Sequence, residues 1–243
     1  MSLSLIVLFP FLGFIINGVL QVSASRLKKK SNVKLSGVIA TLAMTASFIC
    51  ACIQAARLHA LPASGRLFEE TLFSWIKLGT LNIDFAYRFD SLSSIFVLVI
   101  TGVGTLIHLY SISYMSHDET PARYFSYLNL FCFFMLNLVL GTTLPLVFLG
   151  WEGVGLASYL LIGYWYKDFE KVIAGQKAFI MNRIGDLGFL LAMFVAFQYV
   201  GTLDLIQLNG AKYEPAVATA FGLLVFFACT GKSAQIPLFT WLP

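Results

Sequence analysis

The stretch FGLLVFFACTGKSAQIPLFTWLP, residues 221–243, places a lysine inside a long apolar segment. Within this stretch Lys232 has eleven mostly apolar residues before it, and Pro237 follows five residues later. A lysine at the centre of a membrane helix costs about 3 kcal/mol, so it normally has an acidic partner or a water-filled cavity. Glycine and proline are typical of places where a membrane helix opens its backbone. The stretch therefore predicts a membrane-spanning helix that is interrupted near Gly231 and Pro237.

The composition of the whole chain supports a membrane protein. Hydrophobic residues make up 58% of the 243 residues and charged residues only 12%, which leaves too little polar surface to cover a water-soluble globule. A helix needs about 20 apolar residues to cross the bilayer. We predict an all-α polytopic membrane protein with about seven transmembrane helices, at residues 3–22, 35–57, 92–113, 124–140, 144–166, 174–200 and from about 215.

One segment between the second and third spans has a different pattern. LNIDFAYRFD, residues 81–90, alternates apolar and polar side chains, which is the periodicity of a β-strand. Gly79 and Thr80 separate it from the segment FSWIKL at residues 73–78. We expect a small extramembrane β-hairpin at about residues 66–90.

Charged residues in the loops predict the orientation. The loops after the first, third and fifth spans carry nine lysines and arginines, whereas those after the second, fourth and sixth carry four. The positive-inside rule then places the amino terminus on the outer side. The densest cluster, at residues 26–34, lies between two spans, so we interpret it as a topology anchor and expect no nucleic-acid binding. Cysteines 50, 52, 132 and 229 lie in apolar runs without nearby histidine pairs, so no metal or iron–sulfur site is predicted.

Three further ionisable residues lie in predicted spans. Glu152 is the one charge in LPLVFLGWEGVGLASYLLIG, residues 144–163, and Arg183 and Asp186 share a helical face in the next span. Glu152, Asp186 and Lys232 are candidates for one polar layer inside the membrane, and Arg183 could simply neutralise Asp186. The functional interpretation makes Lys232 a proton carrier controlled by Glu152; the structural one is a static ion pair between helices. Ionisable residues inside a membrane usually belong to functional sites, which favours the functional interpretation.

His108 lies in the third predicted span and has no acidic neighbour at helical spacing. It is either a packed histidine or a candidate proton relay. Both interpretations stay open at this stage.

Several motifs resemble a known family. These are WEGVGLASYLLIGYW (151–165), NRIGDLG (182–188), GKSAQIPLFTWLP (231–243), RFDSLS (88–93) and HLYSISYM (108–115). They look like the antiporter-like subunits of respiratory complex I, NADH-quinone oxidoreductase, and most like its distal subunit L or chain 5 type. The resemblance covers essentially the whole chain.

The resemblance implies a subunit that translocates protons, driven by quinone reduction elsewhere in the complex. Glu152 matches the family's essential glutamate and Lys232 its lysine on the broken helix, while Asp186 and Arg183 match family positions between them. No cofactor is expected in this chain; NADH, FMN, iron–sulfur clusters and quinone belong to other subunits. The implied partners are other complex I membrane subunits, especially the neighbouring antiporter-like one, and the lipid bilayer. The implied location is the bacterial cytoplasmic membrane or the mitochondrial inner membrane.

By the same resemblance, residues 1–123 form an amino-terminal three-helix segment with the hairpin, and residues 124–243 an incomplete first antiporter-like repeat. We therefore expect an amino-terminal fragment of a longer protein. The large subunit of a multisubunit Na⁺/H⁺ antiporter carries similar Glu and Lys motifs and is the alternative, with a membrane-bound hydrogenase subunit as a weaker one. A non-transporting scaffold, in which the buried charges only lock helices together, is an alternative of another class.

Overall fold

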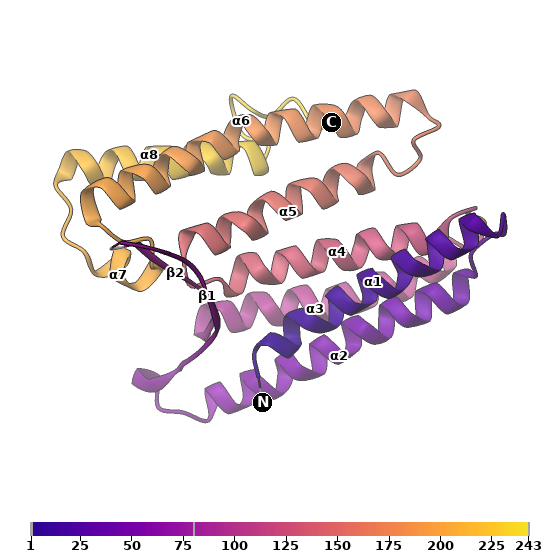
Figure 1. Ribbon diagram of the computed structural model, residues 1–243, viewed down its shortest axis with the longest axis horizontal. Helices are drawn as coiled ribbons and strands as arrows, with labels where there is room; N and C mark the ends of the chain where they lie inside the picture. The colour runs from indigo at the N-terminus through magenta and orange to yellow at the C-terminus, as the bar shows by residue number, and fades with distance from the viewer. Residues whose placement is uncertain (1, 80, 243) are drawn as a thin grey trace. The chain divides into compact units, whose positions relative to one another are not determined.

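The computed structural model describes residues 2–79 and 81–242 (Figure 1). Seven of its helices are long and apolar enough to cross a membrane, as the sequence predicts. A two-stranded sheet accompanies them. The fold class expected from the sequence is thereby confirmed. Contacts between residues divide the chain into two compact units, residues 1–70 with 87–140 and residues 71–86 with 141–243.

The first unit contains four of the membrane-spanning helices. They are α1 (Ser4–Arg26), α2 (Val33–His59), α3 (Ser91–Tyr114) and α4 (Pro121–Leu140). Helix α1 packs against α2 and α4, and α3 also packs against α2 and α4. Side-chain caps define two helix starts: the Asn32 side chain accepts the N–H groups of Lys34 and Leu35, and Asp90 forms a capping box with Ser93.

The predicted hairpin consists of β1 (Leu67–Leu78) and β2 (Leu81–Asp90). Gly79 has a φ of +56°, a conformation that glycine adopts without steric cost. An Arg88–Glu69 ion pair of 3.1 Å links the two strands near their other end. The hairpin begins within a residue of its predicted start.

The second unit contains the other three spans, α5 (Leu144–Ile162), α6 (Phe169–Val200) and α8 (Pro215–Lys232), with the short helix α7 (Leu205–Gly210). Helices α6 and α8 run side by side (Figure 1). Glycines permit their close approach, because a Cβ at Gly188 would lie 2.8 Å from the carbonyl oxygen of Leu224 and one at Gly231 would lie 3.2 Å from Cα of Gly185.

The carboxyl end of α8 lies at the lysine of the long apolar segment. Lys232 is its last residue, and residues 233–242 continue in turns. The indole N–H of Trp241 donates to the carbonyl oxygen of Gly231 at 2.8 Å, so this segment folds back on the helix end. The helix therefore ends at the predicted place, next to Gly231, and its continuation beyond Pro237 stays a prediction. Helix α4 packs with α1–α3 in the first unit. The predicted domain boundary at residue 123 marks the start of a repeat, and packing does not test it. That boundary stays a prediction.

Candidate functional site

Glu152 and Trp151 lie on α5, whose first turn contains Pro145. Pro at this position is favourable because its missing N–H has no helical partner there. The Glu152 side chain is 18% exposed and forms an ion pair with Arg183 of α6. A carboxylate of low exposure in a membrane span is therefore compensated by a cation from the neighbouring helix.

Asp186 is the most buried charge of the site, with a side chain that is 3% exposed. The indole N–H of Trp151 donates to its Oδ1 at 2.6 Å. Its Oδ2 lies 4.0 Å from Nε of Arg183, the neighbour three residues earlier on α6. Sequence spacing predicted this second contact.

Lys232 approaches the same carboxylate from α8. Its Nζ lies 3.8 Å from Oδ1 of Asp186 and 5.7 Å from the centre of the Trp151 ring. Its position at the last residue of α8 is also favourable, because the carbonyl end of a helix attracts cations. Its Nζ has no hydrogen-bond partner among the described residues, so the ion pair holds it without a direct hydrogen bond.

The four charges form a chain of alternating sign across three helices, in the order Glu152, Arg183, Asp186, Lys232. The predicted polar layer is present, but its pairing differs from the expected Glu152–Lys232 pair. Arg183 and Asp186 both lie on α6. Arg183 pairs with Glu152 of α5, and Asp186 pairs with Lys232 of α8. Arg183 lies within ion-pair distance of both carboxylates.

His108 lies in the first unit, fully buried on α3. Its Nδ1 lies 2.7 Å from the carbonyl oxygen of Gly104, and its Nε2 lies 3.1 Å from the amide nitrogen of Asn129 on α4. These contacts fit a neutral imidazole whose Nδ1–H donates to Gly104 and whose Nε2 accepts from Asn129. Both ring nitrogens have partners, as in a packed histidine, and the relay role stays a prediction.

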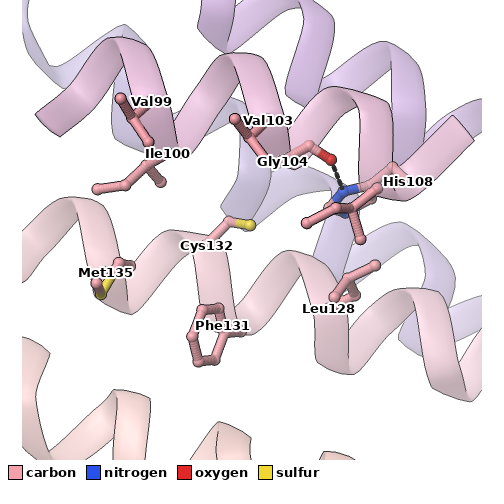
Figure 2. A pocket seen from close by; sticks show the side chains of 10 residues that line it. Val99, Ile100, Val103, Gly104, His108, Leu128, Phe131, Cys132 and Met135 are labelled. Atoms are coloured by element: carbon pink, nitrogen blue, oxygen red, sulfur yellow. Dashed lines mark hydrogen bonds between the residues drawn. The ribbon is translucent and has the colours of Figure 1, made fainter. Parts of the chain in front are cut away.

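An apolar pocket of about 220 Å³ lies beside this histidine, between α3 and α4 (Figure 2). Val103, Phe131, Cys132 and Met135 are among its lining residues. His108 reaches the pocket with its nitrogens already bonded, so the pocket offers a ligand mainly hydrocarbon contacts. Among residues 2–79 and 81–242, no group of three His, Cys, Asp or Glu side chains is placed to hold a metal ion.

The sequence analysis missed two residues of the charged site, Trp151 and Gly155. Trp151 holds Asp186, and a Cβ at Gly155 would lie 2.6 Å from Nζ of Lys232. The signal was available in the sequence, since Trp151 and Gly155 are four residues apart on one helical face and both lie within one turn of Glu152.

Comparison with known proteins gives two family matches. Residues 141–243 match the family described as NADH:quinone oxidoreductase/Mrp antiporter, transmembrane, and residues 75–125 match the amino terminus of NADH-ubiquinone oxidoreductase (complex I) chain 5. NADH-quinone oxidoreductase subunit L of Rickettsia bellii is 35% identical over 98% of this chain. The chain belongs to the subunit L family of NADH-quinone oxidoreductase. The family recognised from the motifs is confirmed.

Other members of the subunit L family align over a shorter stretch at higher identity. Subunit L of Mycobacterium tuberculosis H37Rv is 48% identical over 73% of this chain, and chain 5 of Allomyces macrogynus is 42% identical over 71%. The chain spans 38% of the length of the Rickettsia protein, 28% of the Mycobacterium protein and 27% of the Allomyces protein.

Two solved structures have the same fold. The Mrp complex from Dietzia sp. DQ12-45-1b matches 100% of this chain with a TM-score of 0.80 at 22% identity, covering 25% of that chain. An archaeal membrane-bound sulfane sulfur reductase matches 98% with a TM-score of 0.78 at 18% identity, covering 46% of that chain. At these identities the likeness concerns the fold alone.

Proposed function

We propose that this chain belongs to a proton-translocating membrane subunit of an NADH-quinone oxidoreductase. The observation that carries the proposal is the alternating chain of charges from Glu152 to Lys232, built on three helices that are long and apolar enough to cross a membrane. The named homologues support the assignment to this complex. Ionisable side chains are costly in such helices, so they are rare there and usually mark an ion or proton pathway.

The shared position of Arg183 suggests how the site moves protons. In the observed arrangement Arg183 pairs with Glu152, and Asp186 pairs with Lys232. When Arg183 moves towards Asp186, it leaves Glu152 with one partner fewer and weakens the hold of Asp186 on Lys232. The Lys232 ammonium then gives a proton to water and later regains one, so each exchange of partners transfers one proton. Quinone reduction in other subunits supplies the energy.

The rest of the assembly follows from the same proposal. NADH, FMN, iron–sulfur clusters and quinone bind to other subunits, and no redox step occurs in this chain. Its partners are the membrane subunits of the complex, the adjacent antiporter-like one above all. The membrane is the bacterial cytoplasmic membrane or the mitochondrial inner membrane, with the amino terminus on the outer side.

The test uses the full-length subunit in its native complex, in sealed vesicles that oxidise NADH. We expect Glu152→Gln and Lys232→Met each to lower the pumping rate by about tenfold or more, the effect of a barrier higher by about 1.4 kcal/mol. Lys171→Gln is the matched control, because Lys171, in the first turn of α6, pairs with the capping residue Asp168 outside this site. Normal assembly with undiminished pumping in both site variants would contradict the proposal.

The alternative is the large subunit of a multisubunit Na⁺/H⁺ antiporter. Two observations support this alternative. The fold matches the Mrp complex, and the description of the matching family includes Mrp antiporters. Proton movement that needs a sodium gradient and no NADH oxidation would establish this alternative. A scaffold without transport predicts instead that the same variants reduce assembly and leave pumping per assembled complex unchanged.

A further inference from the structure

Gly155 forms part of the surface on which the Lys232 ammonium rests. This glycine is buried on α5, one turn after Glu152. A Cβ at this position would lie 2.6 Å from Nζ of Lys232, closer than carbon and nitrogen atoms approach without bonding. The lysine therefore occupies the space that a side chain at residue 155 would fill.

Trp151 forms the other part of the same surface. It lies four residues before Gly155 on one face of α5, and its ring centre is 5.7 Å from Nζ of Lys232. Its indole N–H donates to Oδ1 of Asp186, the oxygen that is also 3.8 Å from Nζ. Trp151 and Gly155 together form the surface of α5 that lies against the Lys232 ammonium.

In the described part of the chain, the ammonium is held by an ion pair and by no direct hydrogen bond. Nζ of Lys232 has no hydrogen-bond partner among the described residues, and Oδ2 of Asp186 has none either. A Lys side chain has several rotatable bonds, so a small obstacle displaces its end without disturbing the helix. An added methyl group at residue 155 would thus move the lysine rather than unfold α5.

We propose that Gly155 is a positioning residue for proton transfer: its missing side chain keeps the Lys232 ammonium on the face of α5 that carries Glu152. This inference rests on the proposed function. Without the space at Gly155, Lys232 is pushed off α5 and away from Glu152, and it can no longer respond when the partner of Glu152 changes. Gly155 itself exchanges no proton and acts only through Lys232.

The test measures proton pumping against NADH oxidation in vesicles that contain the complete complex. We expect Gly155→Ala to lower pumping by between about tenfold and about 100-fold, since a displacement of about 1 Å has effects of this size on reacting groups. Gly222→Ala is the matched control, because a Cβ at Gly222 on α8 meets nothing within 4 Å. The control should pump as the unchanged protein does.

A double variant separates positioning from a general packing effect. If Gly155 acts through Lys232, then Gly155→Ala has no further effect on the residual pumping of Lys232→Met. An equal loss in both backgrounds, or no loss from Gly155→Ala alone, overturns the inference. Normal pumping by Lys232→Met overturns the proposed function and the inference with it, whereas impaired Lys232→Met with normal Gly155→Ala overturns the inference alone. If Gly155→Ala prevents assembly, restored assembly in the double variant supports the clash, and assembly that stays lost overturns it.

Discussion

Trp151 contacts two neighbouring members of the charged chain, Asp186 and Lys232. Trp151→Phe keeps an aromatic ring near the lysine and removes only the donor to Asp186. A hydrogen bond to a charged group contributes about 1.5–3 kcal/mol, so we expect pumping to fall by about tenfold. Trp165→Phe, outside the charged site, is the control for the pumping assay. Equal pumping rates in the two variants would show that the donor to Asp186 is dispensable.

Residue types and spacing predicted the members of the charged site but not all of their contacts. The Arg183–Asp186 contact follows from a separation of three residues on one helix, whatever surrounds it. The Glu152–Arg183 and Asp186–Lys232 contacts depend on how α5, α6 and α8 are rotated about their axes, which small residues such as Gly185 and Gly231 decide. One sequence does not give these rotations, so the expected Glu152–Lys232 pair was the wrong choice among the charges available.

At the scale of elements, glycines determine how α6 meets α8. A Cβ at Gly188 would lie 2.7 Å from the Phe227 ring and 2.8 Å from the carbonyl oxygen of Leu224, and a backbone oxygen has little freedom to yield. We expect Gly188→Ala to destabilise the protein by about 1–3 kcal/mol, the usual cost of overpacking. A lower thermal midpoint in detergent, with Gly222→Ala unchanged, would confirm this. A midpoint at or above that of the unchanged protein would mean that the two helices separate at little cost.

Glu70 of β1 holds the first turn of α1. Its carboxylate accepts hydrogen bonds from the Ser2 hydroxyl and from the N–H groups of Leu3 and Ser4, which are among the free donors at a helix start. Burial alone would raise the pKa of Glu70, but these hydrogen bonds outweigh it and hold the pKa below the usual range.

A depressed pKa makes the contribution of Glu70 depend on pH. The stabilisation is complete above the unfolded-state pKa of about 4.3 and is lost as the pH falls through the lower pKa of the folded protein. We therefore expect the amide protons of Leu3 and Ser4 to exchange faster below about pH 4, after correction for the intrinsic rate. Glu70→Gln should exchange fast at every pH and lose this dependence. The same pH dependence in both proteins would assign it to another group.

At the scale of the whole molecule, hydropathy was sufficient to find all seven spans, because apolar runs of this length have few other uses. The ends were less predictable. Helix α6 begins at Phe169, five residues before the predicted start, because its first turn is polar and is capped by Asp168. The membrane ends where the side chains become polar, whereas the helix continues until its backbone hydrogen bonds end.

Loop charge is the basis for predicting which side of the membrane each end of the spans faces. Single cysteines in place of Lys29, between α1 and α2, and of Lys77, on the hairpin, report opposite sides if the positive-inside rule holds. We expect a membrane-impermeant maleimide to label position 77 in sealed right-side-out vesicles and position 29 only in inverted ones. The four native cysteines lie within α2, α4 and α8, so the protein without added cysteines is the control for background labelling. Labelling of position 29 from outside would invert the topology, and the Lys232 site would then have to receive its protons from the opposite compartment.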